Sequence, residues 1–398
     1  MSYPLFRLRS SRHVAGGPAL SGVAVADLFA GAGGLGLGVI AAGADLRVSV
    51  DLDPASCETL RLNARKQSGD VVEADVAQLS GAALRRLARV AKREPFVVVG
   101  GAPCQPFSKA AYWIESGQDA RYRRARARGE SAARPTPLSR PRLDKRRTLT
   151  DDFFRLVLAS KADGFVFENV PSILHPRNKK AFLGLLAEVE SRGYITTIER
   201  ANAVAFGVPQ KRERIFVLGM RRRTVEPPSA THSTTPDDDR GLLPMPTAGP
   251  ALAPFATPRF HEPEEVIRGR WAAHLSEVPP GWNYKWHTAW AGHRTPTFVT
   301  ETRYWHFLLK LHPDLPSWTV PAGPGPWTGP FHWDSRRLRT PEYAALQGFP
   351  REYTFSGSRR ARIRQIGNAV PPQVGQAMIR SVLDAVEGLS SQHRRRAS

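Results

Sequence analysis

Hydrophobic and polar positions follow two patterns along the first half of the chain. Short β-branched runs predict strands at residues 23–27, 47–51, 71–73, 96–100, 165–168 and 214–219. Apolar residues at helical spacing predict helices between them, at residues 35–42, 55–66, 81–91, 151–160 and 179–191. Strands that alternate with helices are typical of a mostly parallel sheet with helices on both faces. We therefore expect an α/β, Rossmann-like fold between Val23 and about Gly219.

Two segments interrupt this alternation. Residues 109–147 are rich in arginine and poor in apolar side chains, so we expect a mobile loop there, either a solvated linker or a lid over an anionic substrate. A proline-rich stretch that begins near Arg221 is typical of a linker into a new domain. All tryptophans but Trp113 lie within 271–333, and we expect most of these rings to form a small loop-rich core rather than a base-contacting surface. Helical patterning returns at residues 341–347 and 372–386, which divides the chain into segments 1–219, 220–335 and 336–398.

Charge and cysteine content narrow the class of protein. The 57 Lys and Arg residues against 36 Asp and Glu give a formal net charge of +21, which favours a polyanion such as nucleic acid as partner. A diffuse basic surface would give the same total, so charge alone does not decide. No apolar stretch approaches the roughly 20 residues that cross a bilayer, and the two cysteines, Cys57 and Cys104, cannot build a disulfide framework or a thiolate metal site. We expect a cytoplasmic protein that has no membrane partner and no metal centre.

A glycine-rich turn follows the first predicted strand and opens a helix. Its glycines, which match the GxGxxG pattern of nucleotide-cofactor sites, are Gly31, Gly33 and Gly36. Asp51 ends the next strand about 20 residues later, where it can hold ribose hydroxyls. Asp27, just before the turn, disfavours a pyrophosphate and is compatible with the positive ammonium and sulfonium groups of S-adenosylmethionine. Two explanations stay open for Asp75, after the third strand: a hydrogen bond to an adenine amino group, or the cap of a helix.

Two chemically reactive side chains stand at the ends of apolar strands. Cys104 follows the run at 96–100, and Glu168 ends the run at 165–168. Because the carboxyl ends of parallel strands meet at one edge of a sheet, we expect the thiol and the carboxyl group near the glycine turn. A cysteine in a strand is more often a small buried hydrophobe, but the loop residues that follow Cys104 favour a nucleophile. Arg212 and Arg214 enter a further strand with both side chains on one face, which suits phosphate or carbonyl oxygens.

Six sequence blocks identify a family. They are DLFAGAGG at 27–34, PCQPFS at 103–108, ENV at 168–170, QKRER at 210–214, LQGFP at 346–350 and QIGNAVPP at 365–372. In these blocks and their order the chain resembles the DNA (cytosine-5) methyltransferase family of the bacterial type. The resemblance covers residues 23–219 and 336–386, and the segment between them matches the family's variable target-recognition domain in position only. It implies the class I S-adenosylmethionine methyltransferase fold, with a discontinuous catalytic domain and a smaller, loop-rich target-recognition domain at 220–335.

The resemblance also implies a covalent mechanism on a cytosine that is flipped out of duplex DNA. The thiolate of Cys104 adds to C6, and the activated C5 takes the methyl group of S-adenosylmethionine. Glu168, protonated or sharing a proton with cytosine N3, stabilises the adduct. Arg214 contacts the cytosine O2, Arg212 supports the site and Asn169 orients the loop. The expected setting is either a restriction-modification system, with a cognate endonuclease for the same site, or an orphan methylase.

Binding residues follow from the same resemblance. The cofactor set is Phe29, Ala30, Gly31, Ala32, Gly33, Gly34, Asp51, Leu52, Asp75, Val76, Gly101, Pro103, Leu149, Asn368 and Ala369. The DNA set is Gln105, Ser108 and Gln210. Leu52 departs from the aromatic residue common at its position, so stacking on adenine has no support there. In the 220–335 segment the candidate base contacts, each with a solvated surface as the alternative, are Asn283, Lys285, Arg294 and Arg303.

Three other functions compete with this one. A nicotinamide-dependent oxidoreductase would use the glycine turn but gives Cys104, Glu168 and Arg214 no common role. A catalytically idle DNA-binding regulator of the same fold would not need the thiol or the carboxyl group. Methyl transfer to RNA is the third, although the large tryptophan-rich segment favours duplex DNA. We expect a monomeric, nucleoid-associated enzyme of the bacterial cytoplasm.

Overall fold

The fold was established in a computed structural model of the chain. It describes residues 22–66, 69–104, 107, 121–122, 125, 130–131, 133, 148–235, 241–298 and 305–397. The side chains of residues 388–397 are not included in this description. The expected mobile loop at 109–147 therefore lies almost wholly outside the described residues.

A seven-stranded sheet forms the centre of the larger part of the molecule. Its strands are β1 (Ala24–Leu28), β2 (Asp45–Asp51), β3 (Asp70–Glu73), β4 (Phe96–Gly100), β5 (Gly164–Asn169), β6 (Tyr194–Asn202) and β8 (Glu213–Arg221). Their spatial order is β3-β2-β1-β4-β5-β8-β6, and β8 runs antiparallel to both of its neighbours. The strand order reverses direction between β1 and β4, so the carboxyl ends of these strands border the crevice where sheets of this kind bind ligands.

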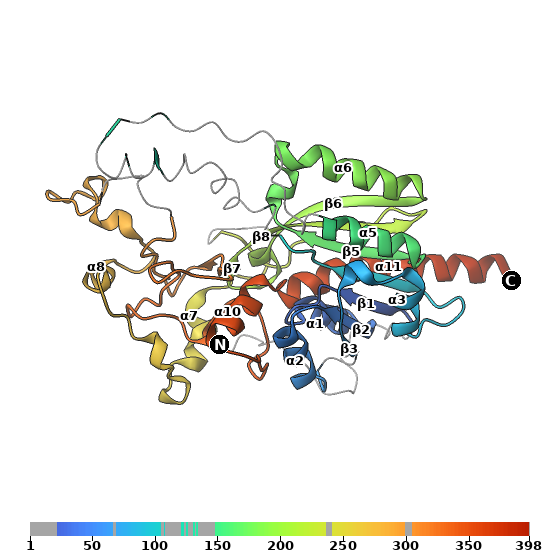
Figure 1. The fold of residues 1–398 in the computed structure, drawn as a ribbon, viewed down its shortest axis with the longest axis horizontal. Helices are drawn as coiled ribbons and strands as arrows, with labels where there is room; N and C mark the ends of the chain where they lie inside the picture. Colours follow the sequence, from blue (N-terminus) through green and yellow to red (C-terminus); the bar gives the residue numbers. More distant parts are fainter. Residues whose placement is uncertain are drawn as a thin grey trace.

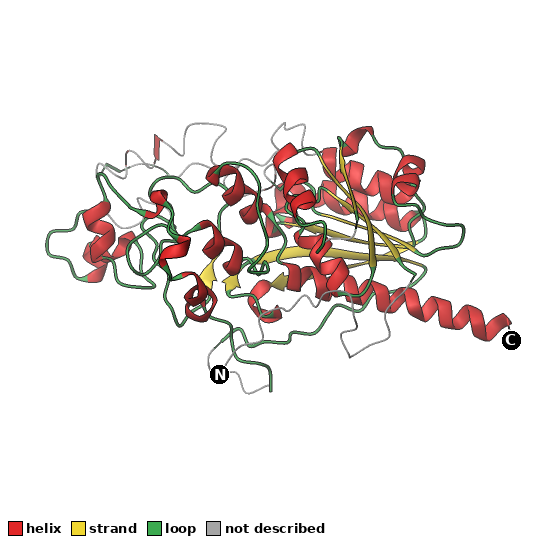
Figure 2. Ribbon diagram, turned by 90° about the horizontal axis from the view of Figure 1, so that it is seen from below, coloured by secondary structure: helices red, strands yellow, loops and turns green. Residues whose placement is uncertain are grey.

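Helices cover both faces of this sheet (Figures 1 and 2). They are α1 (Gly34–Ala41), α2 (Pro54–Leu62), α3 (Gly81–Leu87), α5 (Thr148–Ala159), α6 (Pro176–Ser191) and α11 (Pro372–Ala397). One apolar core joins α1 and α11 to the sheet through residues such as Val39, Met378 and Val382. The second core, on the opposite face, contains the α5 rings Phe153 and Phe154. The end of the chain thus packs against its beginning.

The remaining elements are short and surround smaller cores. They are β7 (Gln210–Lys211), α7 (Ala248–Leu252), α8 (Ala272–Glu277), β9 (Ser317–Trp318), α9 (Thr340–Leu346) and α10 (Arg359–Asn368). β7 pairs with β9 in a separate two-stranded sheet, and Figure 1 shows β7 between the large sheet and the end of the molecule that carries α8. Tyr284, Phe298 and Phe331 belong to a core of this outer region.

The α/β fold with a mostly parallel sheet is confirmed, although several elements were not predicted, β6 and α10 among them. β6 was not predicted, because it is an edge strand whose faces are only partly buried and its sequence YITTIERAN lacks a continuous apolar run. α10 was not predicted either, since it has a low mean hydropathy and only Ile363 and Ile366 as large buried apolar side chains. In the part of the chain that the structure describes, no helix is both long enough and apolar enough to span a membrane.

Candidate active site

One large cavity opens at the carboxyl ends of the central strands. Its volume is about 610 Å³, and residues from both ends of the chain line it. Of the cofactor set expected from the sequence, its walls contain Phe29, Ala30, Gly31, Gly34, Asp51, Leu52, Asp75, Val76, Gly101, Pro103, Leu149, Asn368 and Ala369. Cys104, Glu168, Arg212 and Arg214 line the same cavity. The structure therefore brings the expected reactive groups and the glycine loop together.

The glycine loop has a backbone that few residues tolerate. Phe29 and Gly31 adopt φ values of 56° and 53°, in the left-handed region that favours glycine. The Gly31 N–H donates to Asp51 Oδ2 at 2.8 Å, which joins the loop to the end of β2. A Cβ on Gly34 would lie 2.1 Å from the carbonyl oxygen of Val370, so glycine is required where the C-terminal segment crosses the loop.

Cys104 follows β4, and the side chain of Asn169 holds the backbone just before it. The Asn169 Nδ2 donates to the carbonyl oxygen of Ala102 at 3.2 Å, and Asn169 Oδ1 accepts from the Val170 N–H at 2.9 Å. The buried amide at the end of β5 thus holds the backbone that leads to the thiol. A Cβ on Gly101 would lie 2.8 Å from Glu168 Oε2, so the glycine leaves room for the carboxyl group beside Cys104.

Glu168, Arg214 and Cys104 form a charged group inside the cavity. Arg214 Nε lies 2.9 Å from Glu168 Oε1, and both side chains are largely buried. Burial raises the pKa of Glu168, while the charges of Arg214 and Arg212 lower it by less. Burial, and then the negative charge of Glu168, raise the pKa of the Cys104 thiol, and the two arginines oppose this shift. The proton equilibria of thiol and carboxyl group are therefore coupled.

Arg212 donates to carbonyl oxygens of the protein itself. It occupies the break between β7 and β8 and is buried. Its Nη2 donates to the carbonyl oxygens of Gly367 at 2.8 Å and Ala369 at 3.1 Å, and its Nη1 to Val320 at 3.5 Å. Burial, and then Arg214, lower the pKa of Arg212 to about 9, so it remains charged at neutral pH. It ties the C-terminal segment to the site, whose wall it also lines.

The end of the cavity near the glycine loop is acidic. Asp51, Asp53 and Asp75 line it, and the cation Arg364, also in the wall, forms an ion pair with Asp53 at 3.3 Å. A pyrophosphate would meet these carboxylates, whereas a cationic cofactor with ribose hydroxyls and an amino group would find acceptors. Asp75 does cap a short helix, since its Oδ1 accepts from the Ala77 N–H at 3.0 Å. Because it also lines the cavity, the two explanations for Asp75 are compatible.

Four residues that the sequence placed at a ligand site do not line the large cavity. Ala32 is buried in a core and Gly33 is the N-cap of α1, so neither lines the cavity. Asp27 is fully buried beneath the loop and does not line it either. Gln210 is not a DNA contact, because it is fully buried with its Nε2 donating to Gln347 Oε1 at 2.7 Å.

Five further expected DNA contacts fall into three groups: buried, exposed, or outside the described residues. Asn283 is buried as well, and its amide is used within the protein. The expected contacts Gln105, Ser108 and Arg303 lie outside the described residues. Arg294 is exposed, as either of its two explanations requires.

Further cavity residues escaped the sequence analysis. They are Leu35, Asp53, Pro54, Ser56, Ala74, Ala102, Arg364, Gln365, Gly367 and Val370. Most are direct neighbours of expected residues, and Gly367 and Val370 belong to the block at 365–372. Arg364 could not have been found this way, since its place in the wall depends on an ion pair with Asp53 from the other end of the chain.

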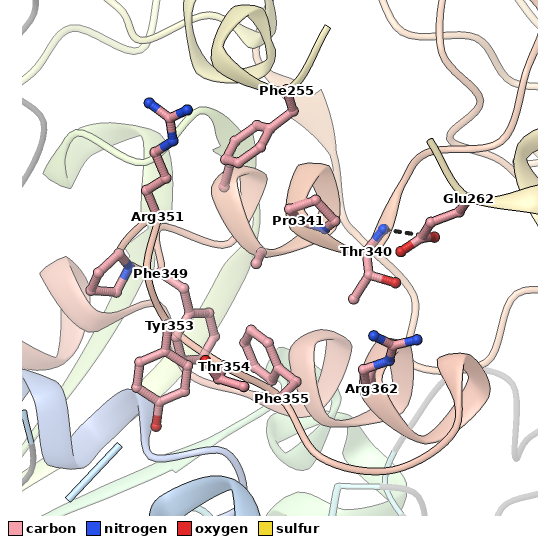
Figure 3. Close-up of a pocket in the computed structure, with 13 residues that line it drawn as sticks. Phe255, Glu262, Thr340, Pro341, Phe349, Arg351, Tyr353, Thr354, Phe355 and Arg362 are labelled. Carbon is pink, nitrogen blue, oxygen red and sulfur yellow. Dashed lines mark hydrogen bonds between the residues drawn. The ribbon is translucent and has the colours of Figure 1, made fainter. Parts of the chain in front are cut away.

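A second cavity, of about 230 Å³, is lined by residues between Phe255 and Arg362 (Figure 3). Phe349, Tyr353 and Phe355 contribute aromatic rings to its wall. The hydroxyl group of Tyr353 donates to the carbonyl oxygen of Ala32 at 2.6 Å, so this wall supports the loop from behind. Its carboxylate, Glu262, already accepts from the Thr340 N–H and pairs with Arg359. The large cavity is therefore the candidate active site.

Comparison with known proteins agrees with this geometry. The model of the family described as C-5 cytosine-specific DNA methylase matches residues 23–384. The chain is 34% identical to the type II methyltransferase M.SacI of Streptomyces achromogenes, over 92% of this chain and 94% of that protein. It is 31% identical to the type II methyltransferase M.NgoFVII of Neisseria gonorrhoeae, over 90% and 86% of the two chains.

Solved structures share the fold. A putative DNA modification methyltransferase encoded within an Escherichia coli prophage superposes with a TM-score of 0.59 at 19% identity, over 91% of this chain and 99% of the other. The S. pombe Dnmt2 methyltransferase superposes with a TM-score of 0.51 at 15% identity, over 92% of this chain and 99% of the other. The backbone arrangement is thus common to these methyltransferases.

Proposed function

The chain belongs to the C-5 cytosine-specific DNA methylase family, and from this membership we propose that Cys104 is the nucleophile that activates a cytosine of duplex DNA for methylation at C5. Methyl transfer to cytosine in DNA is the activity of the family. The observation that carries the assignment of residues is the single cavity that Cys104, Glu168 and Arg214 share with the glycine loop. Because cytosine C5 is inaccessible in a stacked duplex, the base has to enter this cavity flipped.

S-adenosylmethionine fits the acidic end of the cavity. Asp51 and Asp75 would hold its ribose and adenine, and the backbone of Phe29 to Gly31 its methionine part, with Asn368 and Ala369 closing the site. When bound, the cofactor supplies the methyl group as an electrophile. The carboxylates at this end oppose the pyrophosphate of a nicotinamide dinucleotide, which argues against the oxidoreductase alternative.

Cys104 and Glu168 together hold the proton that the reaction requires. With a raised thiol pKa, Cys104 is protonated in the free enzyme, and an ionised Glu168 opposes its ionisation. A proton that leaves the thiol for Glu168, or for cytosine N3 beside it, frees the thiolate without changing the net charge of the site. The thiolate then adds to C6, C5 accepts the methyl group, and loss of the C5 proton with release of the thiolate restores the ring.

Arg214 and Asn169 position these two groups. The guanidinium group of Arg214 holds Glu168 at 2.9 Å and can donate a further hydrogen bond to the cytosine O2. Asn169 fixes the backbone before Cys104. A restriction-modification setting with a cognate endonuclease is supported by the relatives, which are named type II methyltransferases.

Mapping the product tests the activity. Mixed-sequence duplex DNA is incubated with the protein and S-adenosylmethionine, and 5-methylcytosine is located by conversion sequencing. We expect one short methylated sequence motif. DNA that stays unmodified would refute the proposal. If RNA incubated in the same way is modified and DNA is not, the RNA alternative holds.

Trapping the adduct tests the nucleophile. Duplexes that carry 5-fluorocytosine at the mapped position cannot lose a proton from C5, so the enzyme should remain covalently bound. We expect a stable protein–DNA adduct with the wild type and with Cys57→Ala as a matched control. Cys104→Ala should form none, and an adduct in that variant would refute the assignment.

A further inference from the structure

A continuous row of tryptophan and lysine side chains starts beside the active site. We call it the tryptophan–lysine strip, and its members are Lys211, Trp318, Trp305, Lys285, Trp290 and Trp282. Lys211 Nζ lies 5.5 Å from the ring centre of Trp318, and that ring lies 5.3 Å from Trp305. Lys285 Nζ lies 5.5 Å from Trp305 and 5.4 Å from Trp290. The Trp290 and Trp282 ring centres are 5.8 Å apart.

Most of the strip is solvent-exposed. Trp290 is 64% exposed, Trp305 43% and Trp282 39%, and these are the most exposed tryptophans among the described residues. The expectation that the tryptophans form a core is correct for Trp271 and Trp286, among others, but wrong for these three. Large apolar side chains gathered at the surface mark interaction sites.

A buried amide holds the strip in place. The Asn283 Nδ2 donates to the carbonyl oxygen of Trp305 at 2.8 Å, and its Oδ1 accepts from the Lys285 N–H at 3.0 Å. One side chain therefore fixes the backbone on both sides of the Lys285 ammonium group. The expected base contact Asn283 is instead a support for its neighbours.

The two lysines have no acidic partner in the part of the chain that the structure describes. Lys285 lies against the two indole rings of Trp290 and Trp305, and Lys211 against Trp318. Contact with an aromatic face orients an ammonium group but leaves its full charge. The strip thus presents oriented positive charges beside flat apolar surfaces.

The strip begins one residue away from the wall of the catalytic cavity. Lys211 directly precedes Arg212, which lines the cavity, and Lys211 pairs with Trp318 where β7 meets β9. An anion that follows the strip from β7 outward has to be extended, and the net charge of +21 favours a polyanion. The phosphodiester backbone of DNA has this form.

We propose that the tryptophan–lysine strip binds the DNA backbone independently of sequence and holds the duplex beside the cavity. The inference rests on the proposed function, because the occupant is taken to be the DNA substrate. An ammonium group binds phosphate as a point charge, which requires no particular base beside it. Lys285, a candidate base contact by sequence, is therefore a backbone contact.

Equilibrium binding to two duplexes tests the proposal. One duplex contains the mapped methylation motif and the other lacks it, and dissociation constants are measured from 50 to 200 mM salt. Lys285→Gln should weaken binding about threefold or more to both duplexes and reduce the slope of log K against log salt by about 0.9. Trp290→Ala should weaken binding about threefold, because it removes one ring that orients the ammonium group.

Arg270→Gln is the matched control. Arg270 also lies over a tryptophan ring, 4.5 Å from the centre of Trp271, but that ring packs against the core and is not part of the strip. The variant loses the same charge and should leave the slope within error of wild type. In turnover assays the strip variants should raise KM for DNA rather than lower kcat.

Several results would overturn the proposal. They are an unchanged salt slope in Lys285→Gln, a loss restricted to the duplex with the motif, and equal effects of Arg270→Gln and Lys285→Gln. Binding of a protein partner, lost in Trp290→Ala while DNA binding is kept, would also do so. Binding to the duplex without the motif needs neither methylation nor a mapped site. A failure of methylation therefore leaves that measurement intact and is distinguishable from a failure of the strip.

Discussion

The thiol and carboxyl group of the cavity control one another through charge. Burial, and then the charge of Glu168, raise the pKa of Cys104, while Arg214 lowers it. The two charges act inside a buried site where screening is weak. In the reactive state the Cys104 thiol and the Glu168 carboxyl group share one proton. Catalysis should therefore be most efficient at a pH between the two pKa values of this pair. Protonation of both groups removes the nucleophile, and ionisation of both removes the acid.

Alkylation of Cys104 should report this coupling. In a Cys57→Ala background, Glu168→Gln removes the negative charge and should shift the pH at which Cys104 becomes reactive to lower values. Arg214→Gln removes the opposing positive charge and should shift it to higher values. The rate of iodoacetamide modification against pH measures both, and shifts in the same direction would contradict the coupling.

The buried carboxyl group of Asp27 should make the stability of the protein depend on pH. Burial, followed by the charge of Asp51, raises its pKa well above the ordinary value of 3.8. A carboxyl group with a raised folded-state pKa contributes stability at pH below its unfolded pKa, and that contribution is lost as pH rises toward the folded pKa. Over this window the free energy of unfolding should fall by up to about 1.4 kcal/mol per pH unit.

Asp27→Asn should abolish that slope. Denaturant unfolding from pH 4 upward measures it, and above the window the variant should be more stable than the wild type. A variant that is less stable at every pH would show that the ionised carboxylate is needed in the folded protein.

Helix α9 depends on a buried ion pair. Arg336 contacts both carboxylate oxygens of Glu342, at 2.7 and 2.8 Å, and Glu342 Oε2 also accepts from the Arg339 N–H at 2.8 Å. Glu342 is fully buried. Loss of its charge would leave the Arg336 guanidinium group without compensation in a largely buried position.

We expect Glu342→Gln to lower the free energy of unfolding by about 3 kcal/mol. The matched control is Glu58→Gln, which breaks an exposed pair with Arg61 and should cost less than about 1 kcal/mol. Denaturant titration of both variants measures the difference. Equal effects would mean that the Arg336–Glu342 pair contributes no more than a surface pair.

Residues at strand ends were predictable, and residues whose environment comes from distant segments were not. Cys104 and Glu168 follow apolar runs, so their place at the sheet edge follows from the strands themselves. Gln210 looked like a ligand contact, but Leu346, Gln347 and Val320 satisfy its amide. Asn283 was misjudged as well, although its partners Lys285 and Trp305 are nearer along the chain. A polar side chain in a motif carries no local sign of burial by residues a hundred positions away.

At the scale of the whole molecule, Arg212 joins the middle of the chain to its C-terminal segment. It donates to the carbonyl oxygens on either side of Asn368, which lines the cofactor end of the cavity. Arg212→Lys keeps the charge but cannot make these hydrogen bonds together. The affinity for S-adenosylmethionine should fall about tenfold, as the loss of one or two hydrogen bonds implies.

Isothermal titration with S-adenosylmethionine or S-adenosylhomocysteine measures this change. Arg223→Lys is the control, because Arg223 also donates to a carbonyl oxygen of the C-terminal part, that of Ala385 at 3.3 Å, but lies outside the cavity wall. It should leave the cofactor affinity unchanged. A similar loss in both variants would mean that Arg212 acts through general stability.

The crossing of Val370 over Gly34 has a consequence for the synthesis of the protein. Residues that begin the cavity are translated first and those that close it last, so a ribosome-bound chain carries Cys104 and Glu168 without a complete site. A message that is cut short yields a polypeptide with the nucleophile but no means to use it. A complete site therefore requires that translation has passed Val370.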